Sequence, residues 1–188
     1  MVLLKKDFNL DVELPADRLV PTLPLRLNYL LWIEDLLESV KSTSDDQCVV
    51  HGIDIGTGAC CIYPILAVRK NNWHFTATEA DEMNYKCSLK TLERNSLQSH
   101  ITLIKVTSET MLNGNINTNI KYDFTMCNPP FFDSDNSGPK SRTDKRPLPM
   151  CPKSGGSASA SEIAVKGGEV QFIKNLINEC QELKNCVR

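Results

Sequence analysis

A glycine loop that joins an apolar run to a helical pattern is the feature that most constrains this fold. The run over residues 48–55 is apolar and β-branched, and it leads directly into Gly56-Thr57-Gly58. Helical spacing follows to about residue 70, with Pro64 in the first turn, where a proline is tolerated. This order predicts a strand, a tight turn and a helix, which is the opening unit of a parallel sheet.

The alternation of strands and helices continues along the chain. We expect further strands over 73–78, 101–106 and 122–126, and helices over 28–40, 81–97 and 168–183. Asn28 is the expected cap of the first of these helices. Residues 1–27 contain Pro15, Pro21 and Pro24, so we expect irregular structure there. This α/β pattern predicts a parallel sheet that binds ligands at the carboxyl ends of its strands.

Composition is that of an ordinary globular protein. The 188 residues suffice for one hydrophobic core, and 41% of them are hydrophobic. A formal net charge of −2 argues against nucleic-acid binding by bulk charge alone, so a polyanion must meet a local basic patch. No apolar stretch approaches the roughly 20 residues of a membrane helix, and no signal segment opens the chain. We therefore expect an intracellular protein with no membrane partner.

The eight cysteines and three histidines do not follow a metal-binding pattern. The cysteines lack CxxC spacing and paired histidines, so we expect reduced, mostly buried thiols and no metal. His51 and His74 lie in or beside predicted strands, where a structural role is the expected one.

The turn Asp54-Ile55-Gly56-Thr57-Gly58 is the first chemical signal. Glu79 follows Gly58 by 21 residues, at the end of the second predicted strand. An acidic side chain in that place accepts hydrogen bonds from ribose hydroxyls. The pair therefore indicates a nucleoside cofactor, with a tight turn beside a solvated acid as the alternative. Cys61 occupies the third glycine position of the dinucleotide pattern, which weakens the interpretation as a nicotinamide dehydrogenase.

Asn128-Pro129-Pro130-Phe131, after the fourth predicted strand, is the second signal. The lone pair of an exocyclic amino group is delocalised into its ring, which makes the nitrogen a poor nucleophile. An Asn oxygen and an adjacent backbone carbonyl can accept its two N–H bonds and turn the lone pair toward a methyl donor. The prolines stiffen the turn and the aromatic residue stacks on a planar substrate. A plain strand-ending turn is the alternative.

With these motifs in this order, the chain resembles the S-adenosylmethionine-dependent RNA adenine-N6 methyltransferases, the family of methyltransferase-like protein 16 and of the bacterial 23S ribosomal RNA adenine-N6 methyltransferase F. The resemblance runs from about Phe8 to Leu183. It is carried by residues 21–29, 52–59, 77–79 and 127–132. It implies a Rossmann-like methyltransferase fold, with a parallel sheet, helices on both faces and the later strands missing.

The resemblance also implies how S-adenosylmethionine would be held. Arg26 would reach its carboxylate, with an ordinary surface ion pair as the alternative role. Glu79 would hold the ribose, and Thr110 would lie near the adenine unless it is merely a loop hydroxyl. The remaining cofactor-binding positions would be Asp54, Gly56, Gly58, Cys60 and Asn128.

The implied target is adenine N6 in a structured RNA, with U6 small nuclear RNA as the expected substrate. Asn128 and the Pro129 carbonyl would bind the amino group, and Phe131 or Phe132 would stack on the unstacked base, although Phe131 suits a core equally. The neighbouring segment carries a local net charge of +4 over residues 138–153. Its basic residues would hold RNA phosphates, with a charged disordered loop as the alternative: Lys140, Arg142, Lys145 and Arg146.

We predict one methyltransferase domain over 1–188, divided into an N-terminal segment and helix (1–47), a cofactor-binding core (48–130), a substrate loop (131–167) and a final helix (168–188). Relative to the family, the chain is expected to be truncated at both ends. The family implies a nuclear location, with the cytoplasm as a further possibility. Two other functions stay open: a glutamine-N5 protein methyltransferase, and a non-catalytic RNA-binding module.

Overall fold

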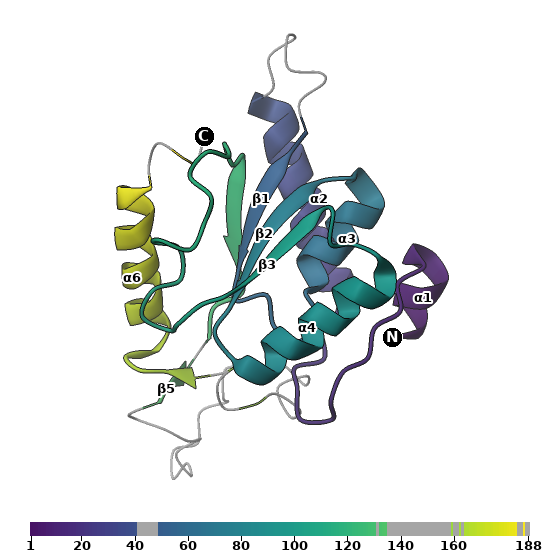
Figure 1. Ribbon diagram of the computed structural model, residues 1–188, viewed down its shortest axis with the longest axis horizontal. Coiled ribbons are helices and arrows are strands. Elements are labelled where there is room, and N and C mark those ends of the chain that lie inside the picture. The colour runs from purple at the N-terminus through teal and green to yellow at the C-terminus, as the bar shows by residue number, and fades with distance from the viewer. Residues whose placement is uncertain are drawn as a thin grey trace, which may run out of the picture.

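Four parallel strands form the central sheet of the computed structural model, which describes residues 1–40, 49–130, 132–134, 159, 162, 164–183 and 186. Their spatial order is β3-β2-β1-β4 (Figure 1). The strands are β1 (His51–Ile55), β2 (His74–Glu79), β3 (Ile101–Lys105) and β4 (Phe124–Cys127). Because β1 has β2 on one side and β4 on the other, the strand order reverses at β1, and such a reversal is where open α/β sheets bind ligands.

Helices cover both faces of this sheet. Three of them pack with β2 and β3 into one hydrophobic cluster: α2 (Leu23–Val40), α3 (Ile62–Asn71) and α4 (Glu82–Asn95). The short helix α1 (Val2–Phe8) adds Leu4 to the same cluster. On the opposite face, α6 (Gly168–Glu182) packs over Ile53 and Ile55 of β1 (Figure 1).

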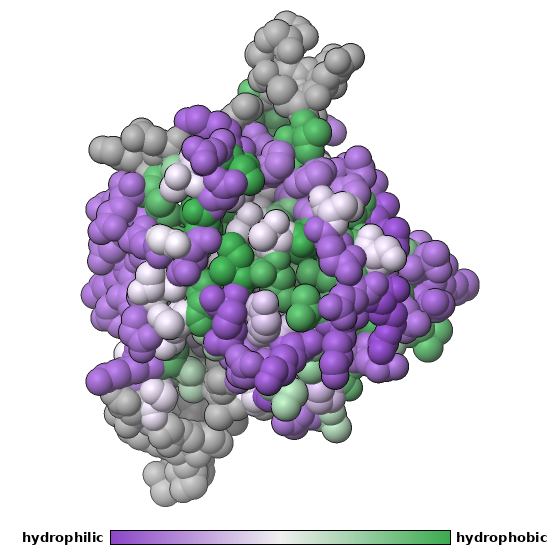
Figure 2. All heavy atoms as spheres, in the orientation of Figure 1, coloured by the Kyte–Doolittle hydropathy of each residue, from purple (hydrophilic) through white to green (hydrophobic). Residues whose placement is uncertain are grey.

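The alternation of side chains along each strand divides the core into these two clusters. Phe75 and Ala77 of β2 belong to the cluster with α3 and α4, whereas Thr76 points to the other face and bonds the Tyr122 hydroxyl at 3.0 Å. A space-filling view shows hydrophobic residues at the centre of one face, ringed by hydrophilic ones (Figure 2). Figure 2 has the orientation of Figure 1, in which α6 stands to the left of the sheet.

The helix expected over 28–40 begins five residues earlier than predicted, at Leu23. The Thr22 carbonyl accepts hydrogen bonds from the amides of Leu25 and Arg26, so the first turn closes there. Pro24 fits this turn because a helix does not use the first amides as donors. Asn28 is therefore inside α2, not its cap, and Arg26 is held on the first turn of a helix.

Two further expectations are corrected. The segment before residue 27 is not wholly irregular, because Val2–Phe8 forms α1, which ends at Asn9 in the left-handed conformation. Tyr122 precedes β4 and its amide donates to the Cys186 carbonyl instead of entering the sheet.

The segment expected to be a loop over 131–167 contains two short strands. β5 (Phe132–Asp133) and β6 (Ala164–Val165) pair in parallel, directly before α6. The Asp133 side chain also accepts a hydrogen bond from the Gly167 amide at 2.9 Å, so the two ends of this segment lie together at the start of α6.

None of the helices in the described parts of the chain is long and apolar enough to cross a membrane.

Candidate cofactor and substrate site

A cavity of about 550 Å³ lies at the carboxyl ends of the strands. Its wall includes Gly56 and Gly58 after β1, Glu79 at the end of β2, Val106 after β3 and Asn128 after β4. A smaller cavity of about 50 Å³ shares both glycines and Asn128 with it and is also lined by Arg26 and Cys60. The position is the one that the strand order predicts for a ligand.

The two glycines of the loop are required by backbone conformation. Gly56 and Gly58 have φ angles of +71° and +72°, a region that L side chains rarely adopt. A methyl group at either position would meet no atom within 4 Å, so space is not the constraint. The amides of Gly56 and Thr57 both donate to the Thr78 carbonyl at 3.0 Å, which bends the loop over the end of β2.

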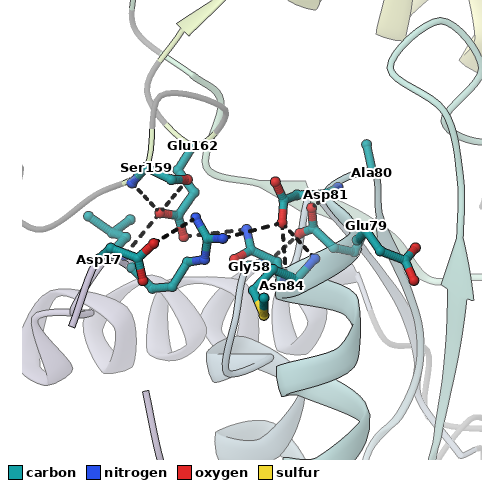
Figure 3. A network of polar contacts seen from close by, with 12 residues as sticks. Asp17, Gly58, Glu79, Ala80, Asp81, Asn84, Ser159 and Glu162 are labelled. Carbon is teal, nitrogen blue, oxygen red and sulfur yellow. Dashed lines mark hydrogen bonds and ion pairs between the residues drawn. The ribbon is translucent and has the colours of Figure 1, made fainter. Parts of the chain in front are cut away.

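Glu79 is fixed at the cavity wall by two backbone amides. Its Oε2 accepts from the Gly58 amide and its Oε1 from the Asp81 amide, each at 2.7 Å (Figure 3). Burial raises the pKa of the Glu79 carboxyl, while these two hydrogen bonds act in the opposite direction. The carboxylate is therefore oriented before any ligand arrives.

Asp54 is buried behind the glycine loop with one oxygen unsatisfied. Its Oδ2 accepts from the Thr57 hydroxyl at 2.7 Å, but its Oδ1 has no hydrogen-bond partner among the described residues. Burial raises the pKa of Asp54 to about 7, against the opposing effect of the Thr57 hydrogen bond. A buried acceptor without a donor is costly unless a ligand supplies one.

Arg26 reaches from α2 across to the end of β4. Its Nη1 donates to the Tyr63 hydroxyl at 2.6 Å and to the Asn128 side-chain oxygen at 3.0 Å. The guanidinium carbon also lies 5.3 Å from the centre of the Tyr63 ring. Its Nε is buried and makes no hydrogen bond to the described part of the chain. Arg26 is thus a half-buried cation whose buried Nε–H has no partner among the described residues.

Asn128 is the first residue beyond β4, where Pro129 and Pro130 follow it. Its side-chain oxygen faces Arg26, and Pro130 joins it in the wall of the larger cavity. The loop glycines and Asn128 therefore lie on the same cavity, as expected if a cofactor and a target group meet there.

Other predicted site residues are placed differently or lie outside the described residues. Thr110 does not line either cavity, and Ser108 and Met111 on either side of it line the larger one. Phe132 is half-exposed in β5. Five predicted substrate-binding residues fall outside the described residues: Phe131, Lys140, Arg142, Lys145 and Arg146.

Glu162 is a site residue that the sequence analysis missed. It lines both cavities, and its carboxylate accepts from the Leu19 amide at 3.1 Å and from the Asn84 side chain at 3.4 Å (Figure 3). The bond to Leu19 joins residues 143 positions apart, and no local pattern marks either of them.

No cluster of His, Cys, Asp and Glu within the described ranges is arranged to hold a metal ion. The cysteines that the structure places are all free thiols: Cys60, Cys61, Cys87, Cys127, Cys180 and Cys186.

The comparisons with known proteins agree with this architecture. Residues 1–188 match the profile of a family described as RNA methyltransferase, so the chain belongs to that family. The mouse RNA N(6)-adenosine-methyltransferase METTL16 is 43% identical over 190 residues, which span 99% of this chain and 34% of the mouse protein. The Drosophila melanogaster U6 small nuclear RNA (adenine-(43)-N(6))-methyltransferase is 37% identical over 195 residues, which cover 61% of that protein.

Solved structures extend the likeness to three dimensions. The human METTL16 catalytic domain in complex with MAT2A 3′UTR hairpin 1 superposes with a TM-score of 0.82 at 42% identity, over 99% of this chain and 61% of that one. The N-terminal domain of human METTL16 in complex with SAH gives 0.72 at 38% identity, with the same coverage. The fold is thus the Rossmann-like methyltransferase fold, and the chain spans about a third of the length of the vertebrate relatives.

Proposed function

We propose that this chain is the catalytic core of an S-adenosylmethionine-dependent RNA adenine-N6 methyltransferase that acts on structured RNA, including U6 small nuclear RNA. The observation that carries the proposal is the meeting of Arg26, the glycine loop and Asn128 on adjoining cavities. The names of the relatives support RNA adenine as the target.

The residues around the cavity fit S-adenosylmethionine. Its methionine end carries a carboxylate and an ammonium. Arg26 offers a half-buried guanidinium whose Nε has no bond to the described residues, and Asp54 offers an unsatisfied oxygen directly behind the glycine loop. Glu79 is placed to accept hydrogen bonds from the ribose hydroxyls. Gly56, Gly58 and Cys60 would contact the cofactor along the loop. When bound, the cofactor supplies an electrophilic methyl group.

The substrate side uses the turn after β4. The Asn128 oxygen and the Pro129 carbonyl accept the two N6–H bonds, so the nitrogen lone pair points at the methyl carbon. Transfer would form the N6–methyl bond as the sulfonium S–methyl bond breaks, which leaves S-adenosylhomocysteine. The nitrogen becomes acidic as it is alkylated, and its proton would pass to water without a dedicated base. Phe131 or Phe132 would stack on the adenine, and Lys140, Arg142, Lys145 and Arg146 would hold phosphates.

The Caenorhabditis elegans and Drosophila melanogaster relatives are named as methyltransferases of U6 small nuclear RNA, and this substrate supports a nuclear location for the present protein. Localisation of a tagged protein by microscopy tests it, and exclusion from the nucleus would contradict it.

The central experiment is methyl transfer from isotope-labelled S-adenosylmethionine to U6 small nuclear RNA, with Glu79→Ala and Glu93→Ala variants alongside. We expect label in RNA as N6-methyladenosine, loss of cofactor binding in Glu79→Ala, and full activity in Glu93→Ala, which changes an exposed residue of α4. Label in a protein release factor would support the glutamine-N5 alternative. RNA binding without label transfer, unaltered by Asn128→Ala, would support a non-catalytic module.

A further inference from the structure

Glu179 is a buried carboxylate on α6 that bonds three consecutive backbone amides. Its Oε1 accepts from the Met111 amide at 3.0 Å, and its Oε2 accepts from those of Leu112 and Asn113 at 2.7 and 2.9 Å. Only 7% of the residue is exposed, and no Lys or Arg in the described ranges pairs with it. The three amides therefore supply the stabilisation of its charge.

The segment that Glu179 binds is one wall of the cofactor cavity. Val106, Ser108 and Met111 line that wall after β3. Within the segment, the Thr110 amide donates to the Thr107 hydroxyl at 3.1 Å, so residues 107–110 form a tight turn. The amides of residues 111–113, which donate hydrogen bonds to Glu179 of α6, directly follow this turn.

The chemistry of the two adjoining cavities changes from one to the other. Arg26 lines the smaller cavity and Asp54 is buried behind the glycine loop, whereas Glu79 and the wall after β3 line the larger cavity. Val106 and Met111 are apolar and nearly buried, and Phe172 of α6 lines the cavity with them. A flat, apolar-faced ring such as adenine fits this end, whereas a carboxylate and an ammonium fit the other.

We propose that Glu179 is a positioning residue for the adenine end of the cofactor cavity. It does not touch the cofactor, and it acts by holding residues 111–113 so that Val106, Ser108 and Met111 keep their place in the wall. The inference rests on the proposed function, because it takes the ligand to be an adenosine-containing cofactor. A carboxylate suits this role since its two oxygens accept three N–H bonds, and the single oxygen of a carboxamide cannot replace both.

The test compares Glu179→Gln with Glu182→Gln, which changes the exposed last residue of α6. The Glu182 carboxylate accepts a hydrogen bond from the Asn113 side chain and from no backbone amide of the described residues. Calorimetry measures the affinity for S-adenosylhomocysteine and for 5′-methylthioadenosine, which lacks the amino-acid end. We expect Glu179→Gln to weaken both at least tenfold and Glu182→Gln to change neither. Equal affinity of Glu179→Gln and the unmodified protein for both ligands would overturn the proposal.

Turnover and amide exchange provide independent readouts. In Glu179→Gln, the KM for S-adenosylmethionine should rise at least tenfold while kcat at saturating cofactor stays within threefold. A kcat that falls by as much as the KM rises would contradict a positioning role.

If the Glu179→Gln variant does not fold, hydrogen exchange of the unmodified protein decides. Protected amides at residues 111–113 without ligand support the tie to Glu179, and exchange at the rate of an unstructured peptide refutes it. Failure of the unmodified protein to bind S-adenosylhomocysteine would instead refute the proposed function.

Discussion

The Arg26 guanidinium donates a hydrogen bond of 3.0 Å to the side-chain oxygen of Asn128. The first residue lies on the first turn of α2 and the second directly after β4, 102 positions further along the chain. The bond uses one lone pair of the Asn128 oxygen and leaves the other free for a target amino group. Arg26 therefore connects the smaller cavity, which it lines, with the residue proposed to orient the substrate.

The first prediction concerns Arg26→Lys. A lysine retains the charge but cannot bond Tyr63 and Asn128 while presenting a further donor to a carboxylate. We expect the affinity for S-adenosylhomocysteine to fall by about 10- to 100-fold, the equivalent of roughly 1.5–3 kcal/mol for hydrogen bonds to a charged group. Isothermal titration measures it, with Arg94→Lys as the control because Arg94 pairs with Glu13 on the surface. An unchanged affinity would mean that Arg26 does not bind the cofactor.

The second prediction concerns Asn128→Ala. Removing the carboxamide leaves the adenine N6 without its oriented acceptor, so kcat should fall by about 100-fold or more. The affinity for S-adenosylhomocysteine should change much less, because Arg26 and Glu79 keep their own positions on α2 and β2. Single-turnover methyl transfer measures the loss, and Asn119→Ala, at an exposed position, is the matched control. Wild-type rates in Asn128→Ala would exclude Asn128 from substrate positioning.

The third prediction concerns pH and Asp54, whose pKa burial raises to about 7. Between pH 4 and 7 the Asp54 carboxyl is protonated in the folded protein and ionised in the unfolded chain. Its contribution to the free energy of unfolding is therefore full below pH 4 and is lost as pH rises through 7. Across that window the free energy of unfolding should fall by up to about 1.4 kcal/mol per pH unit, relative to Asp54→Asn. Urea titrations at several pH values measure the difference. Parallel pH profiles for the two proteins would show that Asp54 is ionised in the fold.

The same group links pH to cofactor binding. The ammonium of S-adenosylmethionine beside Asp54 should lower its pKa, so binding near pH 6.5 releases a proton. Calorimetry in buffers of different ionisation enthalpy detects the release. Asp54→Asn should abolish it, and a release that persists in this variant would assign the proton to another group.

The fourth prediction concerns Gly52 in β1. A Cβ there would lie 2.5 Å from the Phe124 ring and 2.8 Å from that of Phe75, two aromatic rings that pack edge to face. Gly52→Ala should therefore lower the free energy of unfolding by about 1–3 kcal/mol through overpacking. Thermal and urea unfolding measure it. The double variant Gly52→Ala with Phe124→Leu tests the cause, since a smaller side chain should recover part of the loss; no recovery would point away from the ring contact.

By itself the sequence determined the parts of the site that depend on local order. Residue periodicity predicted the alternating strands and helices, because side-chain spacing of 2 and of 3.6 residues is a property of the strand and the helix themselves. The order of these elements also predicted that the glycine loop, Glu79 and Asn128 lie close together, because parallel strands bring their carboxyl ends to one edge of the sheet.

Only the tertiary structure decided how distant segments meet at that edge. The bonds of Arg26 to Asn128, of Glu162 to Leu19 and of Glu179 to the wall after β3 each join residues more than 60 positions apart. The start of α2 at Leu23 belongs with them, because the turn at Thr22 presents Arg26 to the end of β4. Such contacts depend on how helices pack on the two faces of the sheet, and side-chain packing across a core leaves no periodic trace along the chain.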